Sequence, residues 1–474
     1  MTRRLLFGAL LASAALAQSI PSYQQLVYPP LKQVRIPEPL SFTLNNGMKV
    51  FLLEDHELPV INGLALVRTG NLFDPADKRG LSSVMADVLR SGGTRVKTGD
   101  QIDEELENIA ASVESSMGET NASLSFSGLK ETAGTVLRVF KDVMIDAEFR
   151  QDKVDLTLSQ MHSGIDRRND DAQGIVEREI SSVIYGRDNS YGWNIEHADL
   201  ARITRADLQA FYRRYYFPKN IMLAIYGDFS APEMRTQIEA LFADWNVEQP
   251  PVPDFPAVTA KPAPGVFLAE KSDVTQTFFA MGELSGTLRD PDYPALEVAV
   301  NILGSGFTSR LMSQIRTKMG LAYSIGAGWG ANYDHPGTFR IVGSTKSVTT
   351  TEAIVASRAE VEKMRAAEVS EQELKTAKDA VLNSFVFFFD SPAKTLNRVM
   401  MYEYYGYPKD FLFEYQKKVT AVTRADVLRV MREHVNPANL SIVAVGNPKD
   451  FGKPLSDAGK VQQIDLSIPP MPAK

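Results

Sequence analysis

Cysteine is absent from this chain of 474 residues. Its absence excludes disulfide bridges, thiolate metal sites, a cysteine nucleophile and a lipidated amino-terminal cysteine. Histidine is scarce, and the five residues of this type are His56, His162, His197, His335 and His434. No two of them stand four residues apart, which is the spacing of paired zinc ligands on one helix. The sequence therefore predicts no metal site within this chain.

Long hydrophobic runs are also rare. Beyond the amino terminus no apolar stretch is long enough to cross a bilayer, so we expect no membrane span. The first 17 residues are typical of an export signal, because Arg3 and Arg4 precede an apolar run from Leu5 to Ala14 and a small-x-small cleavage site ends at Ala17. A buried first helix is the alternative interpretation. We expect an exported, soluble protein, and a cysteine-free chain fits an oxidising compartment such as a bacterial periplasm.

Positive charge is not in excess either, since the formal net charge is −7. Nucleic acid and anionic lipid are therefore poor candidates as partners. Hydrophobic residues make up 44% of the chain, enough for two or three cores of ordinary domain size.

The chain contains an internal repeat. Thr204-Arg205-Ala206-Asp207-Leu208 recurs as Thr423-Arg424-Ala425-Asp426-Val427, and the same offset of 219 residues pairs Pro218, Asn220 and Gly227 with Pro437, Asn439 and Gly446. In each copy Thr is placed to cap an amphipathic helix, a Pro-x-Asn turn ends the helix, and a strand follows at 221–226 or 440–445. We infer a duplication.

The repeat and the proline content predict the organisation of the chain. We expect a signal peptide at 1–17, an extended proline-rich arm at 18–41, a first domain at 42–245, a proline-rich linker at 246–265, a second domain at 266–460 and a tail at 461–474. A hairpin over 42–53 is expected to turn at Asn46-Gly47, the preferred two-residue turn. Strands and helices mix without a strict alternation, which favours an α+β fold of two similar domains, each an antiparallel sheet backed by helices.

Several segments carry a resemblance to a known family. They are Leu44-Asn45-Asn46-Gly47-Met48-Lys49-Val50, Arg68-Thr69-Gly70-Asn71-Leu72-Phe73-Asp74-Pro75, Lys78-Arg79-Gly80-Leu81, Gly306-Phe307-Thr308-Ser309-Arg310-Leu311 and 315–324. In this order and spacing the chain resembles the insulinase/pitrilysin family of inverted-motif zinc peptidases, which includes mitochondrial processing peptidase. The resemblance covers about residues 36–455. It implies two similar domains that form one half of a clamshell around a peptide.

The zinc site that this resemblance implies is vacant. Active members carry H-x-x-E-H on the first-half helix, with two His as zinc ligands and the Glu as general base. The apolar spacing of 81–89 predicts that helix here, but the motif positions hold Ser83, Ala86 and Asp87. The third ligand, a Glu on a later helix, aligns with Gly164. We interpret Asp87 as a solvated carboxylate near Arg90.

The second half keeps what the family uses there. Active members place an Arg and a Tyr, seven residues apart, at the zinc of the first half, where the Arg holds a substrate carbonyl and the Tyr donates to the oxyanion. Arg316 and Tyr323 stand in the matching positions. The alternative is that both residues are structural. The segment Val113–Met117 matches the edge strand on which substrates pair, with Glu114, Ser115 and Ser116 as an atypical sequence, and the glycine-rich loop of related non-catalytic subunits is reduced to residues 303–306.

Loss of the metal ligands with retention of the Arg/Tyr pair is the pattern of non-catalytic subunits in heterodimeric members. The resemblance thus implies a subunit that binds peptide substrates and completes the active site of a related zinc-bearing peptidase partner. It implies no cofactor in this chain and zinc in the partner. Two other hypotheses are a periplasmic peptide-binding or chaperone-like module without proteolytic role, and a structural scaffold of an envelope assembly.

Overall fold

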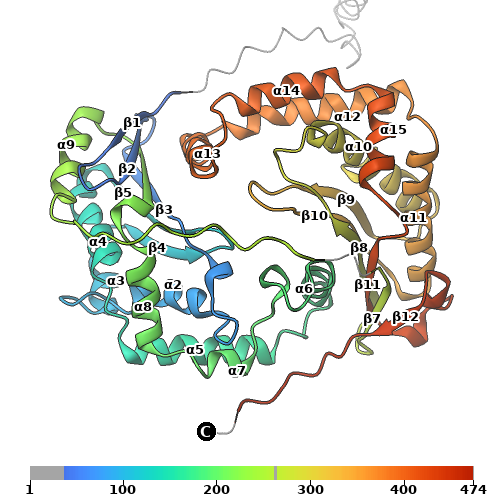
Figure 1. Ribbon diagram of the computed structural model, residues 1–474, viewed down its shortest axis with the longest axis horizontal. Helices are drawn as coiled ribbons and strands as arrows, with labels where there is room; N and C mark the ends of the chain where they lie inside the picture. The colour runs from blue at the N-terminus through green and yellow to red at the C-terminus, as the bar shows by residue number, and fades with distance from the viewer. Residues whose placement is uncertain (1–36, 261–263, 473–474) are drawn as a thin grey trace, which may run out of the picture. The chain divides into compact units, whose positions relative to one another are not determined.

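The computed structural model describes residues 37–260 and 264–472 and contains two six-stranded sheets backed by helices (Figure 1). The first sheet has the order β1-β2-β6-β3-β5-β4, and the second has the order β12-β7-β11-β8-β10-β9. The strands are β1 (Leu40–Thr43), β2 (Lys49–Glu54), β3 (Val60–Val67), β4 (Ser112–Met117), β5 (Ala122–Leu129), β6 (Ile221–Gly227), β7 (Val266–Glu270), β8 (Gln276–Leu284), β9 (Ser324–Gly330), β10 (Thr338–Lys346), β11 (Ser441–Gly446) and β12 (Val461–Gln463). The predicted signal peptide at 1–17, and the predicted arm up to residue 36, lie outside the described residues.

Helices of both halves follow the same succession. The first half contains α2 (Leu81–Ser91), α3 (Gly99–Glu107), α4 (Ala133–Ile145), α5 (Gln151–Asp166), α6 (Ala172–Tyr185), α7 (His197–Leu200), α8 (Arg205–Tyr215) and α9 (Ala231–Leu241). The second half contains α10 (Tyr293–Gly304), the π-helix η7 (Leu311–Lys318), α11 (Thr350–Ala366), α12 (Glu371–Asn383), α13 (Pro392–Tyr405), α14 (Phe411–Ala421) and α15 (Arg424–His434).

The matching strand orders confirm the α+β class and the two similar halves. Within each sheet the pairing is mixed rather than purely antiparallel. Strand β6 runs parallel to β2 and antiparallel to β3, and β11 runs parallel to β7 and antiparallel to β8. The late strand of each half returns to the middle of its sheet after a series of helices, and such a crossover permits parallel pairing.

The repeated sequence forms the same local structure twice. The Thr204 hydroxyl accepts a hydrogen bond from the backbone N–H of Asp207, and the Asp207 carboxylate accepts one from the N–H of Thr204. Thr423 and Asp426 form the same capping box at the start of α15. The predicted helix starts are therefore confirmed, and with them the strands β6 and β11 that follow.

The first hairpin forms where it was expected but with a different turn. Leu44 and Met48 are the last hydrogen-bonded pair, so three residues, 45–47, form the loop. Gly47 has φ +92°, and the N–H of Gly47 donates to the carbonyl of Leu44. A type I turn followed by a left-handed residue is the usual three-residue solution. The expected two-residue turn at Asn46-Gly47 is wrong by one residue.

A buried carboxylate fixes the start of α2, the helix on which the family would carry zinc. Asp74 accepts hydrogen bonds from the backbone N–H groups of Gly80 (2.8 Å) and Ser82 (2.9 Å). These N–H groups have no partner within the helix, so the carboxylate satisfies them. Burial raises the pKa of Asp74 to about 6, and the two hydrogen bonds oppose that rise. The apolar face of α2, predicted from its spacing, is buried in the first-half core.

Each sheet buries one face under a helix from the other half. Helix α6 packs Ile175, Ile180 and Ile184 against Ala280 of β8 and Val443 of β11. Helix α13, in turn, packs on the first sheet, where Leu396 and Met400 meet a group of residues from β2, β3 and β6, namely Phe51, Leu53, Leu66 and Ala224. Figure 1 shows α6 beside the second sheet and α13 beside the first. The two halves therefore share their cores by exchanging equivalent helices.

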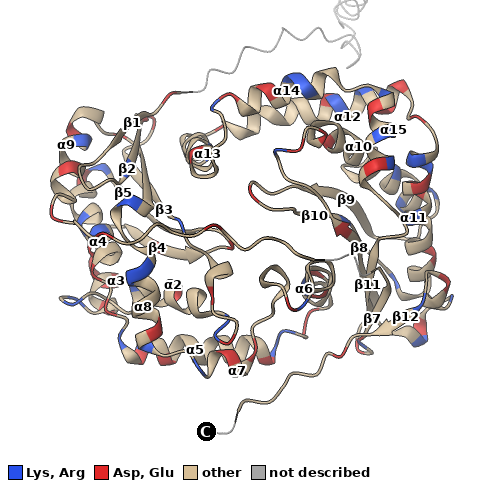
Figure 2. Ribbon diagram, viewed as in Figure 1, with Lys and Arg blue, Asp and Glu red and all other residues tan. Residues whose placement is uncertain are grey.

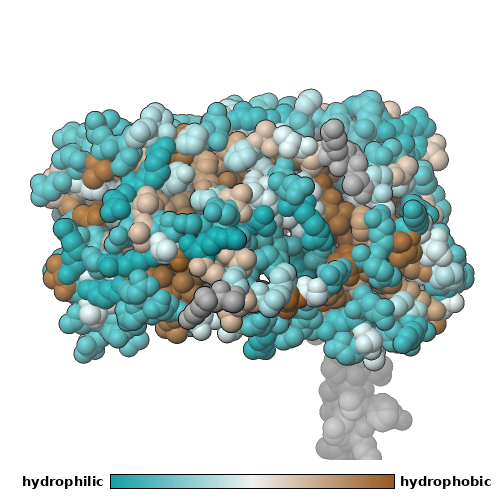
Figure 3. Space-filling model, turned by 60° about the horizontal axis from the view of Figure 1, so that its bottom comes forward, coloured by the Kyte–Doolittle hydropathy of each residue, from teal (hydrophilic) through white to brown (hydrophobic). Residues whose placement is uncertain are grey.

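The surface is polar and of mixed charge. Acidic and basic residues alternate over the helices of both halves (Figure 2). Hydrophilic residues cover most of the face drawn in Figure 3, and hydrophobic ones lie in separate patches. In the part of the chain that the structure describes, no helix combines the length and apolarity needed to span a membrane.

The helix exchange predicts that a cavity in α13 weakens the whole fold. Leu396 is 1% exposed, and Leu396→Ala should lower the free energy of unfolding by about 2–5 kcal/mol, the usual cost of deleting a buried leucine. Urea unfolding followed by tryptophan fluorescence measures this change. The neighbouring Asn397 is exposed, so Asn397→Ala is the matched control and should shift the midpoint little. A Leu396→Ala midpoint equal to that of the control would mean that α13 contributes nothing to the first-half core.

Candidate functional site

The face of α2 that would carry a zinc motif is built but has no donor set for zinc. Ser83 and Asp87 lie one turn apart on α2, half-buried and exposed respectively, and Ala86 is buried against the sheet. The Ser115 hydroxyl of β4 donates a hydrogen bond to the Ala86 carbonyl, so α2 lies directly beside this edge strand. A catalytic zinc needs three protein ligands and an open position. One carboxylate, a hydroxyl and a methyl group do not fit it.

Gly164 lies in the last turn of α5, which packs against α2. The residue is exposed, and a Cβ added there would meet nothing within 4 Å. Open space of this kind admits the side chain that the family carries, so packing does not require glycine at this position. The vacancy predicted from the sequence is thus a lack of donors in an intact scaffold.

The interpretation of Asp87 as a partner of Arg90 is wrong. Arg90 forms an ion pair with Asp103 of α3, and its Nε lies 3.8 Å from the Glu114 carboxylate of β4. Within the described ranges Asp87 has no ion-pair partner. Partial shielding from water raises the pKa of its carboxyl group. Arg90 reaches carboxylates on two neighbouring elements, and this tertiary choice wins over the weak helical i, i+3 pairing.

Strand β4 is the edge of the first sheet, next to β5 alone. Ser115 and Ser116 are paired across the ladder with Leu124 and Ser123, and the Ser116 and Ser123 hydroxyls lie 2.8 Å apart. Glu114 is exposed. An edge strand presents unpaired backbone N–H and C=O groups on its outer side, to which an extended peptide can add.

Arg316 and Tyr323 are brought together on the second half. The Arg316 Nε donates a 2.8 Å hydrogen bond to the Tyr323 backbone carbonyl, and the Tyr323 N–H donates to the Ser344 carbonyl of β10. Arg316 ends the π-helix η7, and Tyr323 directly precedes β9, the edge of the second sheet. The backbone of Tyr323 is thus held from two sides.

The side chains of this pair point their polar groups to solvent. Tyr323 is 49% exposed, and no described residue forms a hydrogen bond with its hydroxyl. Arg316 is exposed too, and only its Nε has a printed partner, which leaves the terminal guanidinium nitrogens available. No hydrogen bond or ion pair among the described residues links the pair to α2 or α5. The structure therefore does not assemble both parts of the family's site within this chain by direct contact.

Two histidines that are far apart in sequence meet beside α5. The His162 and His197 rings stack with centroids 5.0 Å apart, and their Nδ1 atoms are 2.7 Å apart. His197 Nε2 lies 3.1 Å from the Asp166 carboxylate. Because an ionised carboxylate only accepts, His197 donates from Nε2, and its Nδ1 accepts the Nδ1 proton of His162. Burial, and next the charge of His197, lower the pKa of His162. Sequence spacing missed this contact, since 35 residues and α6 separate the two rings.

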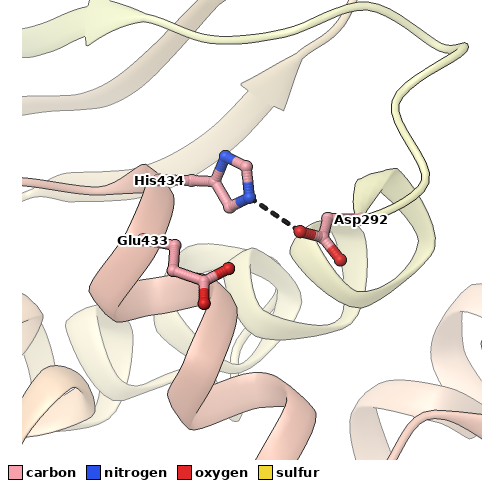
Figure 4. A group of neighbouring side chains, drawn as sticks. All are labelled: Asp292, Glu433 and His434. Carbon is pink, nitrogen blue, oxygen red and sulfur yellow. Dashed lines mark hydrogen bonds and ion pairs between the residues drawn. The ribbon is translucent and has the colours of Figure 1, made fainter.

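Asp292, Glu433 and His434 lie close enough to hold an ion (Figure 4). The Arg429 guanidinium already spans the carboxylates, at 2.7 Å and 2.9 Å from Asp292 and 2.8 Å from Glu433. Arg429 holds the pKa of Asp292 down at about 2, and His434 donates to Asp292 as well. An ion would have to displace Arg429, so this group is an ion-pair network that ties the start of α10 to the end of α15.

Comparison with known proteins gives consistent matches. Residues 51–195 match the family model described as insulinase (peptidase family M16), and residues 202–381 match the one described as peptidase M16 inactive domain. An "uncharacterized zinc protease" of Rickettsia felis is 24% identical over 313 residues, which are 64% of this chain and 72% of the relative. A probable mitochondrial-processing peptidase subunit beta of Arabidopsis thaliana is 22% identical over 444 residues, which are 88% of this chain and 80% of the relative.

A solved structure shares the fold. The crystal structure of a peptidase M16 inactive domain from Pseudomonas fluorescens superposes with a TM-score of 0.78 at 23% identity, and it covers 88% of this chain and 100% of its own.

Restoring donors should restore metal binding stepwise. The purified chain should retain no stoichiometric zinc after dialysis, and Ser83→His with Ala86→Glu and Asp87→His should introduce only two ligands and a base. Adding Gly164→Glu should tighten zinc binding further, because it supplies the third ligand. Gly164→Ala in the same background is the matched control, since either substitution favours the helix by up to about 1 kcal/mol but only Glu donates. Titration with a zinc-sensitive dye measures this. Equal affinity of the Glu and Ala variants would refute the placement of Gly164.

The His162–His197 contact predicts a pH dependence with a definite sign. The lowered pKa of His162 means that the folded state binds fewer protons than the unfolded chain. Its contribution to stability is therefore complete above about pH 6.5, the ordinary histidine pKa, and is lost as the pH falls through the lowered value. His162→Gln should flatten this part of the curve of unfolding free energy against pH.

His56 is a control of opposite sign. Its hydrogen bond to Asp228, 2.6 Å long, raises its pKa, so its contribution is present at low pH and is lost as the pH rises through the raised value. His56→Gln should leave the acid-side loss of stability in place. An acid-side curve unchanged in His162→Gln would show that the contact is not maintained in solution.

Proposed function

This chain belongs to the insulinase family, peptidase family M16, and we propose that it is a non-catalytic subunit of a zinc metalloendopeptidase. In this role it binds peptide substrate and completes the active site of a related, zinc-bearing partner subunit. The observation that carries the proposal is the combination of a donor-free face on α2 with an Arg316/Tyr323 pair whose polar groups are held toward solvent.

The absence of zinc ligands assigns the metal to the partner. Zinc would supply Lewis-acid polarisation of the substrate carbonyl and activation of water there. The positions Ser83, Ala86, Asp87 and Gly164 offer one carboxylate between them, and no residue stands at the position of the general base. Proteolysis by this chain alone is therefore not expected, and no cofactor is assigned to it.

Tyr323 and Arg316 have the chemistry that a hydrolytic site in the partner needs. When water adds to a peptide carbonyl, its oxygen becomes anionic, and a donor aimed at that oxygen stabilises the transition state. The exposed Tyr323 hydroxyl is such a donor, and its backbone is fixed by Arg316 and by β10. The terminal nitrogens of Arg316 are available for a substrate carbonyl while Nε anchors the side chain. A purely structural pair would have no reason to leave these groups without partners.

The edge strand β4 is the proposed place for peptide substrate. Its outer backbone groups, at Glu114, Ser115 and Ser116, are free to pair with an extended segment, which adds as a further strand. Main-chain pairing of this kind tolerates many side chains, so it suits a peptide-processing assembly. The same surface would also serve a peptide-binding or chaperone-like module without proteolysis, but such a module needs no oxyanion donor at Tyr323.

Partner and compartment follow from the family and from the amino terminus. One relative is named as a subunit of mitochondrial-processing peptidase, and we extend subunit status to this chain as part of the proposal. The partner would carry H-x-x-E-H, and the two chains would enclose the peptide as halves of a clamshell. Export to a periplasm rests on residues 1–17, with their two arginines and short apolar run.

Tyr323→Phe tests the catalytic part of the proposal. The substitution keeps the ring and removes only the hydroxyl, so assembly with the partner and zinc content should stay unchanged. Loss of one oxyanion donor typically lowers turnover by about 10²–10³-fold, and the loss should appear in kcat as well as in kcat/KM. Steady-state kinetics of the mutant complex with an intact zinc partner measures this effect.

Two variants complete the experiment. Tyr226→Phe, at a half-buried tyrosine of β6, is the matched control and should keep wild-type kinetics. Arg316→Ala should raise KM and also lower kcat, because it removes both a substrate donor and the hydrogen bond that fixes Tyr323. A wild-type kcat in the Tyr323→Phe complex would favour the peptide-binding module instead.

A further inference from the structure

The second half contains a cavity at the place equivalent to the vacant zinc site. Aligning Leu89, Ser91 and Gly92 with Leu303, Ser305 and Gly306 pairs Ser83 with Glu297 and Asp87 with Asn301. Helix α12 begins 220 residues after α5, and this offset pairs Gly164 with Ser384. Glu297, Asn301 and Ser384 all line one cavity of about 240 Å³. The second half has thus kept a polar cavity where the first half has lost its donors.

The cavity lies among α10, α12, α13 and α14, which are grouped in Figure 1. Its walls are mostly aromatic and aliphatic, and the lining includes Leu288, Tyr293, Tyr333, Phe388, Tyr402, Phe411, Leu412 and Tyr415. A volume of this size is about eight times the share of one water molecule in the liquid. It is below the roughly 300–1,000 Å³ of pockets for drug-sized ligands, so only a small molecule fits.

One side of the cavity carries a buried carboxyl group. Burial raises the pKa of Glu297 to about 7, and a hydrogen bond from Tyr293 opposes the rise. No lysine, arginine or histidine among the described residues forms an ion pair with Glu297. A buried carboxylate without a cation is costly, and an ammonium group in the cavity would compensate it.

Another part of the lining carries a guanidinium group without an anion. Arg398 of α13 stacks on Phe388, with its Cζ 4.3 Å from the ring centroid, and donates to the Tyr402 hydroxyl at 3.4 Å. Its Nε is buried and has no hydrogen-bond partner, and no described carboxylate forms an ion pair with it. Guanidinium groups bind carboxylates in a planar, two-point geometry.

We propose that this cavity binds a small zwitterion with an apolar side chain, whose ammonium group meets Glu297 and whose carboxylate meets Arg398. Free amino acids and short dipeptides share this chemistry. The two charged groups line the same cavity but form no ion pair with each other, so a ligand with both charges satisfies both of them. A simple cation or a simple anion would leave one group uncompensated. The aromatic walls suit the apolar side chain.

This inference is independent of the proposed role at a partner's zinc site. It uses the isolated chain, needs no proteolytic activity, and involves neither Arg316 nor Tyr323. A ligand of this class is what peptide breakdown releases, so the cavity would report on the supply of peptide products.

Isothermal titration of the full chain with L-leucine and with leucyl-alanine tests the proposal and separates the two sources. N-acetyl-leucine lacks the ammonium group, and leucinamide lacks the carboxylate. Each should bind at least about tenfold more weakly than the better zwitterion, since each loses one charge-assisted contact. Tighter binding of leucine would identify a free amino acid as the ligand, and tighter binding of leucyl-alanine would identify a dipeptide.

Variants locate the binding. Glu297→Gln and Arg398→Lys should each weaken the better zwitterion at least about tenfold. Asp379→Asn, at an exposed carboxylate of α12 paired with Lys375, is the matched control and should bind as the wild type does. The proposal is overturned if neither zwitterion binds the wild type at about 10 mM, if the blocked ligands bind equally well, or if Glu297→Gln binds as the control does.

Discussion

Each sheet of this protein can bury one face only by accepting a helix from the other half, and this constraint determines where the functional surfaces lie. Helix α6 leaves the first half to cover β8 and β11, and α13 leaves the second half to cover β2, β3 and β6. The helix before each of them, α5 or α12, therefore keeps a fixed place beside α2 or α10. Helix α13 acts on both halves, since Leu396 packs on the first sheet while Arg398 lines the cavity of the second.

Duplication has given two equivalent helix pairs with different fates. On α2 and α5 the donor positions hold Ser83, Asp87 and Gly164, and the scaffold remains intact around them. On α10 and α12 the equivalent positions hold Glu297, Asn301 and Ser384 around a closed aromatic cavity. The edge strands differ in use as well, since β4 stands beside the empty face while β9 follows the fixed backbone of Tyr323. One ancestral layout can thus support a substrate edge, a donor pair and a small-molecule cavity.

Local signals predicted much of this, and tertiary contacts account for the rest. The capping boxes at Thr204 and Thr423, the apolar face of α2 and the vacancy at Ser83 follow from residue type and spacing alone. Arg90 did not pair with Asp87 because Asp103 and Glu114 come closer from other elements. The contact of His162 with His197 and the helix exchange join segments far apart in sequence, and no periodicity encodes such pairings. The cavity at Glu297 could have been suspected, since the internal repeat aligns that residue with a ligand position.

The central claim is that this chain completes the zinc site of another subunit. Native mass spectrometry of the complex isolated from the source cells, with its zinc content, tests it most directly. The account predicts a heterodimer of this chain with one related chain that carries H-x-x-E-H, with one zinc ion per pair. Isolation of this chain only as a monomer or a homo-oligomer, or one zinc ion bound for each copy of this chain, would contradict it.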